Sequence, residues 1–175
     1  MTYILFLVTI LLANLSPWPA YANVLQEYDK VIWIDQEKQV GAAYERGKKL
    51  SAFPILTGDD ETPTPPGVYA VKLKDRTYYS RQYETPMPYS LFFDLKGMRA
   101  IHEGAVPDPD EKDEKGDWAT HGCIHVEAPY MKWLYDWTVP GKTVVVIHGG
   151  RVWEDEENWE GEDREAGKLS EKSEE

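Results

Sequence analysis

The residues best suited to chemistry lie in one stretch, Ile101 to Val126, which holds the only cysteine of the chain and three of its four histidines. His102 comes first, and the run Thr120-His121-Gly122-Cys123-Ile124-His125 follows after a long acidic insert. An imidazole beside a thiol suffices for nucleophilic acyl transfer, because the ring takes the thiol proton and later returns one to the leaving group. We therefore predict that Cys123 is a nucleophile and that His102 is its proton donor and acceptor.

The residues next to Cys123 suit a nucleophile held in a tight turn. Gly122 removes a Cβ where the chain must turn, and the N–H groups of Gly122 and Cys123 are expected to face a developing oxyanion. Thr120 is expected to hydrogen-bond locally and to hold this turn. Because a free thiol is mostly protonated at neutral pH, we expect the imidazole to lower the pKa of Cys123. A strand that ends at His102 would give the base a rigid support.

Two other roles are open to these side chains. A lone cysteine is often a small buried hydrophobe, although three nearby histidines favour the nucleophile here. A structural zinc site could use His102, His121, Cys123 and His125 as ligands. That site would need His121 and His125 on one helical face, which Gly122 and its β-branched neighbours oppose. We expect neither a metal ion nor another cofactor.

Residues 1–22 have the pattern of a secretory signal peptide. They carry no charged side chain, are mostly apolar from Tyr3 to Leu15, and end in the small-x-small run Ala20-Tyr21-Ala22. The apolar run is shorter than the roughly 20 residues of a membrane span, so we expect cleavage before Asn23 and no span afterwards. The predicted location is the periplasm or cell wall. An oxidising compartment favours disulfides, and a single cysteine without a partner there suggests a thiol kept for use.

The charge of the chain argues against two classes of partner. The formal net charge is -12, and residues 151–175 carry 11 acidic and 4 basic side chains. Polyphosphates and anionic lipids repel such a chain, so nucleic acid and membrane surfaces are disfavoured as partners. We predict one domain over residues 23–150 and a partly disordered acidic tail over residues 151–175.

The pattern of the domain predicts a mainly β fold. Short β-branched and aromatic runs bounded by Gly and Pro predict seven strands. They are Val31–Asp35, Gln39–Glu45, Lys49–Leu56, Gly67–Leu73, Leu91–Leu95, Met98–His102 and Thr143–Ile147. The proline-rich segment Thr57–Gly67 is expected to lie outside any central strand. His148 follows a core strand, and we interpret it as structural.

One helix is expected, over Glu127–Trp137, with Pro129 in its first turn. Its apolar residues recur at the spacing of one helical face, which should pack on the sheet beneath the nucleophile. These residues are Tyr130, Trp133, Leu134 and Trp137.

Two further segments leave alternatives open. The section from Tyr78 to Tyr89 is rich in Tyr, Met and Pro, and either lines a binding cleft or closes the edge of a sheet. Residues 103–117 carry seven acidic side chains, and form either a lid or a solvated insertion.

His102, a spacer of 17 residues and Thr120-His121-Gly122-Cys123 resemble the signature of the L,D-transpeptidase family, the YkuD-type catalytic domain. Thr57-Gly58 with Thr64-Pro65-Pro66-Gly67, and the run Pro86-Met87-Pro88-Tyr89, resemble further segments of that family. The resemblance covers roughly residues 31–148.

The resemblance implies a β-sandwich of mixed sheets and an exported enzyme that acts on peptidoglycan stem peptides. It implies that Cys123 attacks the third residue of a donor tetrapeptide and expels D-Ala, that an acceptor amine resolves the thioester, and that carbapenems acylate the cysteine. His121 and Gly122 would shape the catalytic turn, and Thr120, His125 and Tyr89 would contact substrate.

Two residues depart from the family pattern. Glu103 stands where many relatives have a small residue, and we expect its charge to raise the pKa of His102. His125 stands where relatives often carry Asn or Arg, and it either keeps a substrate-contacting role with a different preference or signals a changed reaction. An L,D-carboxypeptidase, another peptidoglycan amide hydrolase, or a non-catalytic wall-binding protein would share these motifs.

Overall fold

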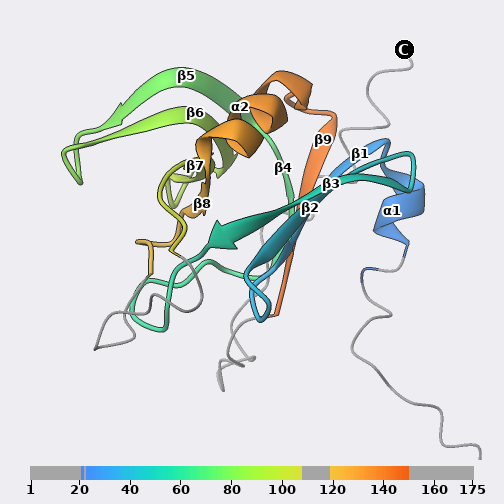
Figure 1. The fold of residues 1–175 in the computed structure, drawn as a ribbon, viewed down its shortest axis with the longest axis horizontal. Helices are drawn as coiled ribbons and strands as arrows, with labels where there is room; N and C mark the ends of the chain where they lie inside the picture. The colour runs from blue at the N-terminus through green and yellow to red at the C-terminus, as the bar shows by residue number, and fades with distance from the viewer. Residues whose placement is uncertain (1–20, 22, 108–118, 150–175) are drawn as a thin grey trace, which may run out of the picture.

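A computed structural model describes residue 21, residues 23–107 and residues 119–149. The acidic tail (151–175), most of the acidic insert and all but one residue of the predicted signal peptide (1–22) lie outside the described residues. In these described residues, nine strands form one sheet in the order β4-β9-β1-β2-β3-β8-β7-β6-β5. Figure 1 shows that the sheet is curled. The pairs β1–β9 and β7–β8 are parallel and the other pairs are antiparallel, which confirms the predicted mixed, mainly β fold. In the described part of the chain, no helix has the length and apolarity needed to cross a membrane.

The first half of the sheet surrounds two buried parallel strands. Its strands are β1 (Lys30–Asp35), β2 (Val40–Glu45), β3 (Lys48–Leu56), β4 (Gly67–Ala70) and β9 (Thr143–His148). The apolar, β-branched run of β9 is buried from Thr143 to Ile147, as expected for a central strand covered on both faces. A single helical turn, α1 (Val24–Glu27), which the sequence pattern did not predict, packs beside β1.

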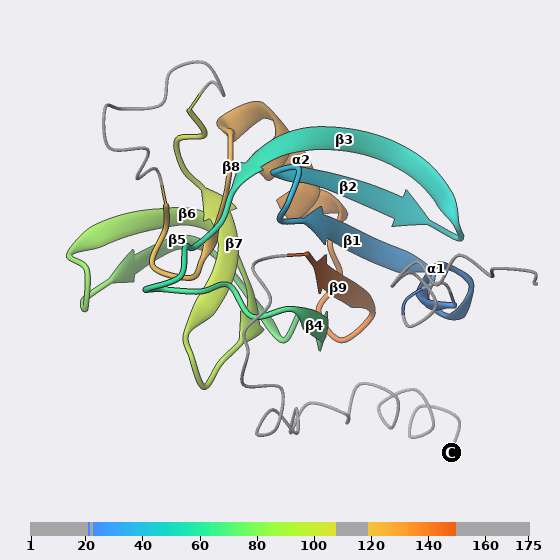
Figure 2. The same cartoon turned by 90° about the horizontal axis from the view of Figure 1, so that it is seen from below.

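The second half of the sheet carries the residues that were predicted to do chemistry. Its strands are β5 (Leu73–Ser80), β6 (Thr85–Asp94), β7 (Arg99–Glu103) and β8 (Ile124–Val126). The long strand β3 joins the halves, because it pairs with β2 over most of its length and with β8 at Ile55 and Leu56. Figure 2 shows β3 arching from one half to the other.

The hairpin β5–β6 corrects the predicted strand Gly67–Leu73. That segment divides near Val71 and Lys72: β4 pairs with β9, whereas β5 pairs with β6. The alternation of apolar and polar residues runs through the division, so it could not reveal that the chain changes partner there. The section rich in tyrosine belongs to this hairpin, which forms one edge of the sheet.

The predicted helix is α2 (Ala128–Trp137), which packs against β6 and β7. Its buried residues are Met131, Leu134 and Tyr135, whereas Trp133 is 37% exposed, and Tyr130 likewise. The predicted apolar face is therefore confirmed at Leu134 and, in part, at Trp137, which is partly buried against the main core, and it is wrong at Tyr130 and Trp133. The helix carries aromatic residues on two adjacent sides, so the sequence pattern did not show that the side with Met131 faces the core.

Each face of the second half has its own neighbours. On one face, Leu91, Phe93, Ile101 and Ile124 join the main core with α2. On the other, Ala100 packs with Met87 and Phe92, and Cys123 lies against them. The helix thus supports the sheet from the face opposite the cysteine.

Lys74 connects the β5–β6 hairpin to the end of this helix. Its ammonium donates hydrogen bonds to the carbonyls of Tyr135 and Thr138 and lies 4.2 Å from the centre of the Tyr135 ring. The last carbonyls of a helix have no partner within the helix, so Lys74 satisfies acceptors that are otherwise poorly solvated.

We expect Lys74→Met to lower the free energy of unfolding by about 1–2 kcal/mol, because two carbonyls lose a charged donor. Chemical denaturation monitored by tryptophan fluorescence measures this change. Lys142→Met is the control, since Lys142 is exposed and its recorded hydrogen bond uses only its backbone. Equal stability of the two variants would contradict the assigned role of Lys74.

Candidate active site

The parallel pairing of β7 and β8 brings the predicted nucleophile and base together. In this register Ile101 pairs with Ile124, and His102 pairs with His125. Cys123 immediately precedes β8 and packs against Ala100, two residues before His102. Since side chains alternate along a strand, His102 and Cys123 are diagonal neighbours on the same face.

The His102 ring is held in one orientation. It is buried, and its Nδ1 lies 2.9 Å from the carbonyl oxygen of Glu103. A carbonyl can only accept, so Nδ1 carries the proton and Nε2 is left to accept another. Burial, together with the neighbouring His125, lowers the pKa of His102 to about 4, so the ring is neutral at neutral pH. A neutral ring has the form needed in a general base.

This environment corrects the expectation for Glu103. Its side-chain charge was predicted to raise the pKa of His102, but the pKa is lowered and only the backbone carbonyl of Glu103 acts in the raising direction. Desolvation of the buried ring outweighs that hydrogen bond.

His125 forms the second wall of the His102 site. The two rings meet edge to face with centroids 4.7 Å apart, and His125 Nδ1 lies 3.2 Å from the Ala105 carbonyl oxygen. Burial lowers the pKa of His125 as well. A Cβ at Gly104 would lie 2.5 Å from the His125 ring, so this close packing requires glycine.

The Cys123 thiol is half-buried, and its burial raises its pKa. The Ala100 backbone and the charge of Arg99 act in the opposite direction but do not outweigh burial. With the thiol pKa raised and the His102 pKa lowered, the proton stays on sulfur at neutral pH. The resting pair is therefore neutral. Our expectation that the imidazole lowers the pKa of the Cys123 thiol was wrong, because burial raises this pKa.

A short turn presents the thiol. The Thr120 hydroxyl donates to the Cys123 carbonyl, and the Thr120 N–H donates to the Thr57 carbonyl at 3.0 Å. Gly122 has a φ of 92°, and a Cβ there would lie 2.9 Å from the Pro63 carbonyl oxygen. Both the backbone conformation and the lack of space therefore call for glycine.

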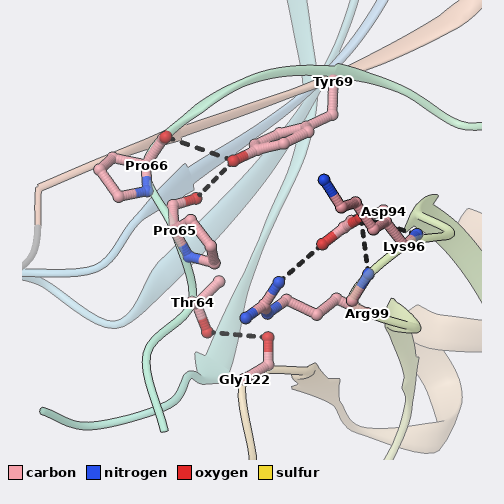
Figure 3. A network of polar contacts seen from close by, with 9 residues as sticks. Thr64, Pro65, Pro66, Tyr69, Asp94, Lys96, Arg99 and Gly122 are labelled. Carbon is pink, nitrogen blue, oxygen red and sulfur yellow. Dashed lines mark hydrogen bonds and ion pairs between the residues drawn. The ribbon is translucent and has the colours of Figure 1, made fainter. Parts of the chain in front are cut away.

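The proline-rich loop Thr57–Gly67 fastens this turn to the rest of the domain. The Thr64 hydroxyl donates to the Gly122 carbonyl at 3.1 Å, a contact drawn in Figure 3, and accepts from the Gly58 N–H at 2.9 Å. The Thr62 hydroxyl donates to the Thr120 carbonyl at 2.7 Å. The sequence pattern marked this segment as a loop, and only these contacts reveal its function as a clamp.

Two other predicted site residues, His121 and Tyr89, are not packed beside His102 as His125 is. His121 is exposed and stacks on Tyr83, in the turn between β5 and β6, with ring centroids 4.6 Å apart. Tyr89 packs against the main core and contacts Tyr135 of α2, with ring centroids 5.5 Å apart. The structure therefore places Tyr89 on the face opposite Cys123 and does not bring it together with the other site residues.

The surroundings of the histidines bear on two further expectations, a structural role for His148 and a possible zinc site. His148 Nε2 lies 3.4 Å from Asp35 Oδ2, and its ring packs on Trp33 in the first half of the sheet, surroundings that suit a structural residue. His121 and His125 occupy a turn and a strand rather than one helical face. Within the described ranges, no three His, Cys, Asp or Glu side chains are grouped to hold a metal ion.

Comparison with known proteins points to one family. The model of the L,D-transpeptidase catalytic domain (YkuD) matches residues 29–147. The chain is 28% identical over 142 residues to the "Putative L,D-transpeptidase YciB" of Bacillus subtilis (strain 168), covering 73% of this chain and 69% of the relative.

Solved structures give the same picture of the fold. An L,D-transpeptidase of Stackebrandtia nassauensis has a TM-score of 0.61 at 22% identity, over 71% of this chain and 58% of that one. A mutant L,D-transpeptidase of Enterococcus faecium has a TM-score of 0.59 at 27% identity, over 69% of this chain and 50% of that one. The match thus spans 58% and 50% of the length of these two solved proteins.

We expect iodoacetamide to alkylate Cys123 at a rate that rises with pH, with its inflection above the ordinary thiol pKa of 9.0, because burial raises this pKa. The rate at each pH is read by mass spectrometry of the intact protein. A reactive plateau below pH 7 would show that a thiolate–imidazolium pair already exists at rest and would contradict the neutral pair.

Proposed function

The chain belongs to the L,D-transpeptidase catalytic domain family, and from this we propose that it is an exported cysteine acyltransferase acting on peptidoglycan stem peptides. The observation that carries the proposal is the position of Cys123, on a tight glycine turn and on the same sheet face as a buried neutral His102. Export is inferred from the sequence of residues 1–22.

In the proposed first step, Cys123 forms a thioester with the donor stem. The sulfur attacks the carbonyl carbon of the third stem residue while His102 Nε2 takes the thiol proton. The backbone N–H groups of Gly122 and Cys123 stabilise the resulting oxyanion. The intermediate then collapses, the amide bond to D-Ala breaks, and His102 returns the proton to the leaving amine.

In the second step, an acceptor amine resolves the thioester. The amine nitrogen attacks the same carbonyl carbon, and His102 removes a proton from it. The carbon–sulfur bond breaks, an amide bond forms, and the thiol recovers its proton from His102. Water as the acceptor would give a carboxypeptidase by the same route.

The remaining polar residues support these steps. Thr120 is buried and its hydroxyl is engaged with the Cys123 carbonyl, so we assign it to shaping the turn. His125 packs against the base and keeps His102 in place, while the exposed His121, stacked on Tyr83, borders the approach to the thiol.

We expect the protein to convert a tetrapeptide muropeptide into a dimer linked through third residues, with release of D-Ala. Cys123→Ala should abolish turnover, and His102→Gln should lower kcat/KM by on the order of 100-fold or more. His148→Gln is a matched control outside the site and should keep wild-type turnover. Mass spectrometry of the products provides the measurement.

Other products would distinguish the alternatives. Tripeptide without dimer would replace transpeptidation by hydrolysis. A carbapenem tests the nucleophile separately, because opening its β-lactam ring on sulfur adds the whole carbapenem mass to Cys123. Neither turnover nor adduct would indicate a non-catalytic wall-binding protein and would overturn the proposal.

A further inference from the structure

The Arg99 side chain lies against the turn that presents Cys123. It leaves the first residue of β7, and its guanidinium extends towards Thr64 and Gly122 in Figure 3. A Cβ built on Gly122 would lie 3.0 Å from Arg99 Nε and 3.6 Å from Arg99 Cδ. Gly122 therefore needs to be glycine partly because this arginine occupies the adjoining space.

The guanidinium is fixed by a carboxylate that is itself fixed. Arg99 Nη1 lies 2.6 Å from Asp94 Oδ2, and the side chains of the pair are only 27% and 16% exposed. The other Asp94 oxygen accepts the N–H groups of Lys96 and Gly97, each at 3.0 Å. Because Asp94 already orients the guanidinium, little further ordering of Arg99 is needed when an anion forms next to it.

The neutral histidines supply no positive charge that could stabilise a thiolate at Cys123. In the described part of the chain, His102 on β7 and His125 on β8 both have lowered pKa values and are uncharged at neutral pH. The charged side chain that acts on the Cys123 thiol is that of Arg99, and Asp94 is its counter-ion.

We propose that Arg99 is a positioning residue that packs under the Gly122 turn and supplies a permanent positive charge to stabilise the Cys123 sulfur as its proton leaves. The proton goes to His102 Nε2, and the charge on sulfur disappears when the carbon–sulfur bond forms. Asp94 orients the guanidinium and partly offsets its charge. This inference rests on the nucleophilic role of Cys123 in the proposed function.

Alkylation of Cys123 by iodoacetamide across pH tests the role of the charge. Arg99→Gln should move the inflection to higher pH and slow alkylation at pH 7.5 by roughly 3- to 10-fold, because an opposite charge close to the thiol favours its ionised form. Arg99→Lys, which keeps the charge, should restore most of the rate. Arg46→Gln is the control, because it removes an arginine from the exposed ion pair with Asp29, which lies outside the site, and it should leave the pH profile unchanged.

Asp94→Asn separates the electrostatic role from a merely structural one. If Arg99 acts by charge, losing its counter-ion should move the alkylation inflection to lower pH, opposite to Arg99→Gln. If the Arg99–Asp94 pair has only a structural role, both variants should lower the melting temperature and neither should move the pH inflection of alkylation. Shifts in the same direction, or an unchanged profile in Arg99→Gln, would overturn the proposal.

The titration needs no peptidoglycan substrate, so its outcome is independent of the enzymatic assay. If the wild-type protein shows no turnover but the two variants shift in opposite directions, the proposed function fails while the role of Arg99 stands. If turnover is present, Arg99→Gln should lower kcat about as much as it slows alkylation, with KM nearly unchanged.

Discussion

The site depends on the register between two parallel strands. Pairing of Ile101 with Ile124 places His102 and Cys123 on one face of the sheet. A slip of one residue would turn one of these side chains to the opposite face, into the core with α2. The buried isoleucines hold the register, because a slip would also turn one of them out of the main core. The hydrophobic core on one face of the sheet therefore fixes the geometry of the proposed catalytic pair on the other face.

Burial sets the electrostatics of the same pair. It moves the pKa of His102 down and that of Cys123 up, so each group is held in its neutral form. A raised thiol pKa keeps the resting thiol largely protonated, which reduces its exposure to oxidation, since the thiolate is the reactive form. Charge then develops only while the proton is moving, when nearby fixed dipoles and charges act most strongly.

The sequence was most informative where one residue type is scarce or one pattern is local. A single cysteine near three histidines indicated the proposed active-site segment, and Pro129 with the following apolar residues located α2 to within one residue. The division between β4 and β5 near Val71 was not predicted, because alternation of apolar and polar residues shows which face a residue occupies but not which strand it pairs with.

Long-range contacts explain what else could not be predicted. Tyr89 has the same aromatic character as Tyr83, yet only the fold shows that the first contacts α2 and the second contacts His121. The Arg99–Asp94 pair lies within a short hairpin and could have been suspected from spacing, but its approach to Gly122 arises only from the tertiary fold.

The end of the β5–β6 hairpin is attached lightly to the rest of the domain. From residue 79 to residue 86, beyond Tyr78 and Met87, which pack with Phe92 and Ala100, its two strands pair only with each other. Its recorded aromatic contact with the reactive segment is the stacking of Tyr83 on His121. This end can therefore lengthen, shorten or be exchanged for that of another protein without disturbing the β7–β8 register. It is a place where evolution or an engineer can introduce new selectivity beside an unchanged proposed nucleophile.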